Sequence, residues 1–169
     1  MLPQGGAQLR FALYWPAMQL VYQLSGAGWA DARISHNSKY RDMAVSYLSD
    51  ALGDMTHAAV RLVRGAREVS FSFQDEPGEH RWLLTRGESD SLRIRILWFR
   101  DTFSRRPQEC GEEVFTCDCT VLDFIGQVSH ELHNILSEQG VDGYKKRWQN
   151  HDFPLDAYTD IQRLLTPQL

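Results

Sequence analysis

Histidine and cysteine are the residue types in this chain that could bind a metal, and two histidines stand close together in His130-Glu-Leu-His133. In metalloproteases the zinc-binding histidines are four residues apart with glutamate as general base, whereas here the separation is three. On a helix whose buried face includes Val128 and Leu132, both histidine side chains would point away from the core. We therefore predict that both are exposed surface residues.

Three cysteines, Cys110, Cys117 and Cys119, fall within ten positions and could supply zinc ligands together with His130. Their spacing is not that of a zinc finger or zinc ribbon. In a strand, Cys117 and Cys119 would face the same side of a sheet, where cysteine commonly serves as a small buried apolar residue. We predict that both lie in the core, with a metal or redox site as the alternative. An odd, crowded set of cysteines also favours a reducing compartment over a disulfide framework.

The sequence contains no recognisable motif for nucleophilic catalysis or phosphate binding. Gly26-Ala-Gly28 lacks the Lys-Ser/Thr pair of a phosphate loop and joins two predicted strands. Paired carboxylates occur at Asp75-Glu76 and Glu112-Glu113, in predicted turns or loops, where solvated charges are more common than an acid and base pair. We therefore predict no catalytic residue and no cofactor.

Two charged segments are the candidate binding surfaces. Asp75, Glu76 and Glu79 surround a Pro-Gly turn beside Arg81, and would form a rigid acidic surface at the end of a hairpin. Polar Pro-Gly turns are also ordinary hairpin ends, but an acidic surface would suit docking onto a basic partner. Residues 101–113 have little apolar content and are predicted to form a mobile loop. The candidate contact residues in this loop are Asp101, Arg105, Arg106 and Glu109.

Aromatic residues are dense near the C-terminus, where they alternate with charged residues. Tyr144, Trp148, Phe153 and Tyr158 lie beside a Lys-Lys-Arg run. Such aromatics could form an interface, but packing of the tail onto the sheet is the more common arrangement. We predict a packed tail.

The elements that position these residues follow from the spacing of apolar side chains. Residues 8–15 and 18–24 carry apolar side chains at alternate positions, as half-buried strands do, and residues 29–34 follow after a turn. From about residue 40 to residue 64 the period changes to that of an amphipathic helix, with Ser38 as its predicted N-cap. Gly65 follows, where a left-handed C-terminal cap is expected.

The second half of the chain repeats the change from strands to helices. Three strand-like runs and a short strand precede a helix over residues 120–139, which starts at a capping box and should end at Gly140. A short helix closes the chain at residues 155–165. The predicted strands are residues 69–73, 80–85, 92–98 and 114–118.

Taken together, these elements predict one α+β domain spanning residues 1–169. It would have an antiparallel sheet of about five to six strands, with two amphipathic helices packed on one face and a short C-terminal helix. Hydrophobic residues make up 43% and charged residues 24%, as in folded globular proteins. The formal net charge of −4 argues against nucleic-acid binding. We find no signal-peptide pattern and no apolar run long enough to cross a membrane, which predicts a cytoplasmic protein.

Four sequence segments resemble a group of small bacterial proteins that are similar to immunity proteins of polymorphic toxin systems, including those paired with Rhs effectors, type VI effectors and contact-dependent inhibitors. The resemblance extends over residues 15–165. It implies a protein that binds a cognate toxin domain in the cytosol and blocks its active site or substrate entry without catalysis. The segments are Gly28-Trp-Ala-Asp-Ala, Tyr47-Leu-Ser-Asp-Ala-Leu52, Asp75-Glu-Pro-Gly-Glu-His-Arg-Trp82 and Gly143-Tyr through Trp148 to Phe153-Pro154.

Two other functions fit the same sequence. An adaptor or chaperone subunit of a secretion system would also be a small acidic α+β protein without catalytic motifs, and a homodimer is possible in either case. The other alternative is a metal-binding protein that uses the cysteines and His130.

Overall fold

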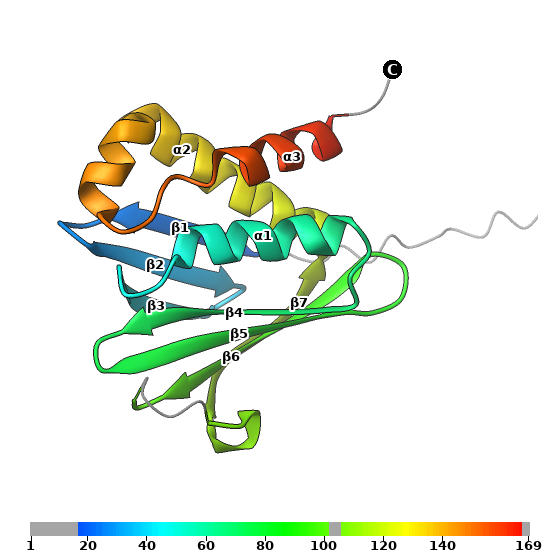
Figure 1. Ribbon diagram of the computed structural model, residues 1–169. Coiled ribbons are helices and arrows are strands. Elements are labelled where there is room, and N and C mark those ends of the chain that lie inside the picture. Colours follow the sequence, from blue (N-terminus) through cyan, green and yellow to red (C-terminus); the bar gives the residue numbers. More distant parts are fainter. Residues whose placement is uncertain (1–16, 102–105, 167–169) are drawn as a thin grey trace, which may run out of the picture.

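The computed structural model describes residues 17–101 and 106–166, which form an α+β fold of two antiparallel sheets and three α-helices (Figure 1). The α+β class is confirmed. The single sheet of five to six strands is wrong, because the described residues contain one three-stranded and one four-stranded sheet. The strand predicted at residues 8–15 lies outside the described residues.

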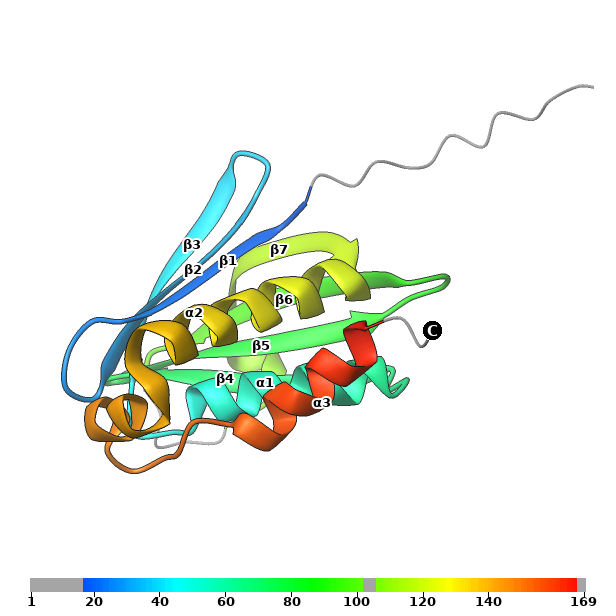
Figure 2. The same cartoon turned by 90° about the horizontal axis from the view of Figure 1, so that it is seen from above.

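The strand order is β1-β2-β3 in the smaller sheet and β4-β5-β6-β7 in the larger sheet. The three α-helices lie together on one side of the two sheets, as Figures 1 and 2 show. The strands are β1 (Gln19–Leu24), β2 (Trp29–His36), β3 (Lys39–Ser46), β4 (Glu68–Asp75), β5 (Gly78–Arg86), β6 (Ser91–Phe99) and β7 (Glu112–Thr120). The helices are α1 (Ala51–Val63), α2 (Val121–Trp148), α3 (Leu155–Leu165) and a short 3-10 helix, η1 (Gln108–Cys110).

The smaller sheet contains the main error of the sequence analysis. The helix predicted over residues 40–64 is wrong in its first part, because residues 39–46 form β3 and pair with β2. In β3 the apolar residues Met43 and Val45 are buried at alternate positions, as a strand with one covered face requires. The β2–β3 turn contains Asn37 at φ 56, a left-handed conformation that asparagine tolerates better than most residues.

Helix α1 therefore begins later than predicted. The side chain of Asp50 accepts a hydrogen bond from the backbone N of Gly53 at 3.2 Å and caps the first turn. Ser38, the predicted N-cap, lies in the β2–β3 turn instead. At the other end Gly65 has φ +93 and its N–H donates to the carbonyl O of Leu62, as predicted for a left-handed cap.

Helix α2 starts where the sequence predicts it and ends nine residues later than predicted. Thr120 and Asp123 form the capping box. Gly140 has φ 65 and ψ 175 and interrupts the helix, but helical geometry resumes and continues to Trp148. Tyr144 and Trp148 in this last part are fully buried, so the aromatic tail packs into the core as predicted.

One hydrophobic core joins both sheets to the three α-helices. In the larger sheet, aromatic residues of β4 and β5 stack on the helix side, with Phe71 and Trp82 ring centroids 5.2 Å apart. Strand β3 contacts both β4 and β7, which are the two edges of the larger sheet. The smaller sheet is thus connected to the larger one mainly through β3 and the shared core.

The outer edge of β1 is covered by side chains of α2. The backbone N of Leu20 donates to Oε1 of Gln127 at 3.0 Å, and the backbone N of Tyr22 donates to Oε2 of Glu131 at 2.8 Å. Arg147 donates to the carbonyl O at the end of β1 at 3.3 Å. Because these side chains occupy the hydrogen-bonding groups of an edge strand, β1 cannot pair with another strand there.

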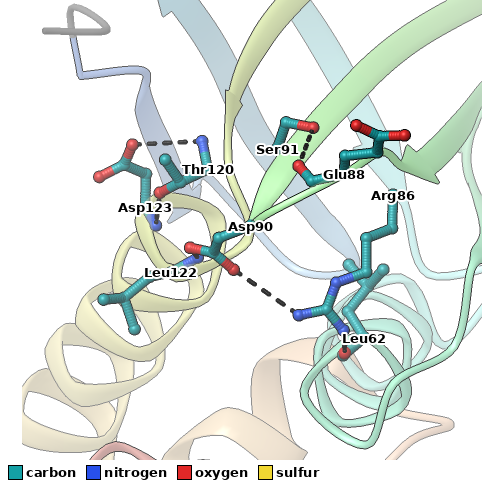
Figure 3. Close-up of polar contacts among 8 residues, drawn as sticks. All are labelled: Leu62, Arg86, Glu88, Asp90, Ser91, Thr120, Leu122 and Asp123. Atoms are coloured by element: carbon teal, nitrogen blue, oxygen red, sulfur yellow. Dashed lines mark hydrogen bonds and ion pairs between the residues drawn. The ribbon is translucent and has the colours of Figure 1, made fainter. Parts of the chain in front are cut away.

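The turn between β5 and β6 connects the ends of α1 and α2 (Figure 3). Nη1 of Arg86 donates to the carbonyl O of Leu62 at 3.0 Å, which satisfies one of the last carbonyls of α1. Asp90 accepts hydrogen bonds from the first turn of α2, with its carbonyl O from Val121 N at 2.8 Å and its carboxylate from Leu122 N at 3.4 Å. Arg86 and Asp90 also form an ion pair at 3.6 Å, so one turn fixes two helices.

Candidate functional site

The residues considered for metal binding are spread over three environments. Cys117 and Cys119 are buried in β7, as predicted, whereas Cys110 is exposed in η1 and His130 is exposed on α2. Residues 17–101 and 106–166 contain no group of three or more His, Cys, Asp or Glu side chains that could hold a metal ion. A hydrogen bond with Cys117, together with burial, raises the pKa of the Cys119 thiol well above its ordinary value, which disfavours the reactive thiolate.

Of the predicted contact residues, Glu109 lies apart in η1, because its neighbour Gln108 lines a hollow with Glu68 and Thr85. By contrast, several of the others lie together at the end of the larger sheet that carries the β4–β5 turn. The β4–β5 turn and the segment that links β6 to β7 meet there, because Nη1 of Arg81 donates to the carbonyl O of Arg106 at 2.8 Å. Arg106 in turn pairs with Asp101 at 2.9 Å. Arg105 lies outside the described residues.

Glu79 and Arg81 differ from the prediction, since they form an internal ion pair. Nε of Arg81 is 2.8 Å from Oε1 of Glu79, and Nη2 is 3.2 Å from Oε2. The side chain of Glu79 is only 9% exposed and also accepts a hydrogen bond from Ser72, while the guanidinium lies 4.1 Å above the ring of Phe99. Glu79 is therefore not part of an exposed acidic surface, and the pair acts as internal support for the turn.

A second internal cluster lies on the opposite, helix-facing side of the same turn. His80 is 2% exposed and its Nε2 accepts a hydrogen bond from Nη2 of Arg41 on β3 at 3.0 Å. Its ring centroid lies 4.5 Å from that of Trp98, with the two rings tilted by 46°, and its Nδ1 has no hydrogen-bond partner among the described residues. Burial, reinforced by the positive charge of Arg41, lowers the pKa of His80 to about 3, so the imidazole is neutral at pH 7.

Close packing holds the turn itself in place. Gly78 lies directly beneath the indole of Trp98, and a Cβ added to this glycine would stand 1.9 Å from the ring. Gly78 pairs with Asp75 across the turn, whose tip is Glu76 and a cis proline. Burial raises the pKa of the half-buried Asp75 carboxyl, with Arg41 opposing this shift. Glu76 is the exposed acid of the turn, whereas Asp75 is partly buried.

At this end of the larger sheet, these contacts leave an exposed charged area, which we call the hairpin-end surface. Its members carry both signs of charge. A shallow hollow of about 290 Å³ lies beside it, between the end of β6 and the start of β7. The surface consists of Glu76, Arg100, Arg106 and Glu112.

Arg41, His80 and Trp98 are important residues of this site that the sequence analysis did not single out. The sequence does contain a signal that His80 is buried, because His80 and Trp82 are two residues apart in a strand and therefore face the same side of β5. Arg41 had no such signal, because residues 39–46 were assigned to a helix.

No protein-family model, curated protein or solved structure matches this chain. None of the helices in residues 17–101 and 106–166 is long and apolar enough to cross a membrane.

Proposed function

We propose that this chain is a cytosolic binding protein that neutralises a cognate bacterial toxin domain by non-catalytic contact. The observation that carries the proposal is the hairpin-end surface, where two segments predicted to contact a partner are joined through Arg81 and Arg106. The resemblance of the sequence to immunity proteins supplies the class of partner. The surface supplies a place for it to bind.

Rigidity supports this role, because a preorganised surface loses little conformational entropy on binding. The Glu79–Arg81 pair holds the turn from one side, and Trp98 packs on Gly78 from the other. The exposed charges therefore project from the end of a paired sheet. The exposed acids of this surface, Glu76 and Glu112, suit a partner with a basic cleft, as a toxin that acts on an anionic substrate would have.

The buried groups support a non-catalytic mechanism. His80, the histidine behind this surface, is 2% exposed and cannot reach a substrate as a general base. Its environment keeps it neutral and hydrogen-bonded to Arg41. The proposed action is therefore occlusion of the toxin by a fixed protein surface.

The experiment begins with affinity purification of the tagged full-length protein from its native cells and mass spectrometry of bound proteins. The proposal expects one toxin domain at equal stoichiometry. Calorimetry then compares the wild type with Glu76→Lys/Glu112→Lys, and with Glu138→Lys, a charge reversal at an exposed position of α2. The double variant should bind at least about tenfold more weakly, equivalent to about 1.4 kcal/mol, and the control within about twofold.

Two outcomes would contradict the proposal. Equal affinity of the wild type and the Glu76→Lys/Glu112→Lys variant would remove the hairpin-end surface from the interface. Recovery of a permanent component of the secretion machinery, with no toxin domain, would instead establish an adaptor or chaperone.

A further inference from the structure

The outer edge of β7 is open, unlike the covered edge of β1. Val121 N donates to the carbonyl O of Asp90 on the β6 side, so the alternation of an antiparallel ladder points the backbone groups of Thr116 and Asp118 away from β6. Within residues 17–101 and 106–166, these outward groups have no hydrogen-bond partner. An edge of this kind is a template for one more extended segment.

A cleft runs along this edge, and its second wall is the β2–β3 turn, at the tip of a hairpin that projects from the fold (Figure 2). One part has a volume of about 700 Å³ and is lined by His36, Lys39 and Asp118 among others. An adjoining part of about 440 Å³ lies beside Tyr40 and shares Lys39 with the first part. Because the cleft has two walls, one extended segment fits it, whereas the edge of another folded sheet would meet the β2–β3 turn.

The charges of the cleft favour an acidic occupant. Arg93 pairs with Asp118 at 2.8 Å, and Arg95 pairs with Glu113 at 2.6 Å. Lys39 lines both parts of the cleft, and it forms no ion pair within the part of the chain that the structure describes. The cleft therefore carries a positive charge that an acidic side chain of a partner would neutralise.

Two further features indicate what else the occupant contributes. Tyr40 is 63% exposed and lines the smaller part of the cleft together with Val114. An apolar side chain of a partner would cover this aromatic surface and remove it from water. In the larger part, Nε2 of His36 is buried and has no hydrogen-bond partner among the described residues. The cleft thus offers backbone groups, a cation and apolar surface to one occupant.

We propose that this cleft binds an extended peptide segment of a partner protein, which adds to the outer edge of β7. The segment carries an acidic side chain toward Lys39 and an apolar side chain toward Tyr40. The two lie within two positions of each other, because the parts of the cleft adjoin and side chains on one face of a strand repeat about every 7 Å. Residues 114–118 offer an edge about 16 Å long at about 3.3 Å per residue. This inference does not depend on the toxin-binding proposal, because no residue of the hairpin-end surface lines the cleft.

Selection from a displayed library of random peptides, about eight residues long, tests the proposal on the full-length protein. Enriched peptides should contain Asp or Glu within two positions of an apolar residue. The most enriched peptide, made synthetically, is the probe for calorimetry. Lys39→Glu should weaken its binding at least about tenfold, because the charge in the cleft is reversed. Lys146→Glu, the same change at an exposed position of α2, should alter binding by less than about twofold.

Two measurements test the backbone contact. Thr116→Pro removes an N–H that points away from β6 and leaves the β6–β7 ladder intact, so it should weaken binding of the probe peptide at least about tenfold. NMR of the wild type needs no variant. The probe peptide should shift the amide signals of Thr116 and Asp118, whereas the amide signal of Tyr22, on the covered edge of β1, should stay in place.

Three results would overturn the proposal. The first is the absence of any enriched peptide. The second is a probe peptide that binds Lys39→Glu as tightly as the wild type, or that shifts amide signals away from β7. The third is self-association of the protein that Lys39→Glu abolishes, because a second copy would then occupy the cleft.

Discussion

Replacing Arg81 by alanine should destabilise the fold rather than merely weaken a contact with a partner. The substitution removes both hydrogen bonds to Glu79, the hydrogen bond to the carbonyl O of Arg106 and the stacking on Phe99. Glu79 would then keep a carboxylate that is almost buried, with Ser72 as its remaining donor.

The magnitude follows from the exposure of the two partners. Exposed ion pairs contribute about 0 to 1 kcal/mol, whereas removal of one member of a buried pair costs about 3 to 5 kcal/mol. The side chains of Arg81 and Glu79 are 18% and 9% exposed, so the pair belongs near the buried limit. The hydrogen bond from Ser72 remains and water can enter the space left by the guanidinium, which places the expected loss at about 3 kcal/mol.

Urea denaturation followed by tryptophan fluorescence measures the free energy of unfolding, with a double-mutant cycle as the control. The cycle uses Glu79→Gln, Arg81→Met and the double variant, which removes both charges and keeps much of the packing volume. The double variant should lose about 2 kcal/mol less unfolding free energy than the sum of the two single variants. A loss below about 1 kcal/mol for Arg81→Ala, or strict additivity, would refute the internal role of this pair. It would return both residues to the exposed surface that the sequence analysis assigned to them.

Three further predictions test other contacts. Gly78→Ala should lower the free energy of unfolding, measured by chemical denaturation, by about 1 to 3 kcal/mol, because the added Cβ would overlap the indole of Trp98. Gly26→Ala is the control, since nothing lies within 4 Å of its added Cβ, and it should change the same quantity by less than about 0.5 kcal/mol. Glu131→Ala should lower the free energy of unfolding by about 1 to 3 kcal/mol in the same assay, because the buried backbone N–H of Tyr22 loses its acceptor. Glu131→Gln keeps an acceptor and should cost less than half as much. His80, with a folded-state pKa of about 3 against an ordinary 6.5, should reduce stability as pH falls from 6.5 to 3, because the unfolded chain binds a proton that the folded one excludes. His80→Gln should therefore lessen the acid-induced loss by up to about 4 to 5 kcal/mol in denaturation curves across this pH range.

Local sequence signals predicted well those elements whose ends are marked by their own residues. The capping box at Thr120 and the glycine at position 65 act through neighbouring backbone groups, so a single sequence is enough to locate them. Residues 39–46 show the opposite case. Ala44 and Val45 fit a helical period that continues into α1, and only pairing with β2, set by distant contacts, makes them a strand.

In the candidate site, too, features set by neighbouring residues were predictable and features set by distant contacts were not. The composition of the two charged segments was visible in the sequence, but their contact at one end of the sheet was not. That contact depends on the β5–β6 pairing and on Arg81, which donates a hydrogen bond to the carbonyl O of Arg106. Whether a charged side chain is exposed also depends on such distant contacts. Glu79 and Glu76 are three residues apart in one acidic turn, yet Glu79 is buried and Glu76 is exposed.

The covered edge of β1 has a consequence for the order of events during synthesis. Leu20 and Tyr22 are bound by Gln127 and Glu131, which follow them by 107 and 109 residues. At a translation rate of about 5 to 20 residues per second, these acceptors emerge roughly 5 to 20 s after the strand that they cover. During this interval the nascent β1 strand has unpaired amides and can associate with neighbouring chains. The completion of α2 therefore ends the period in which the growing polypeptide is most prone to aggregate through this edge.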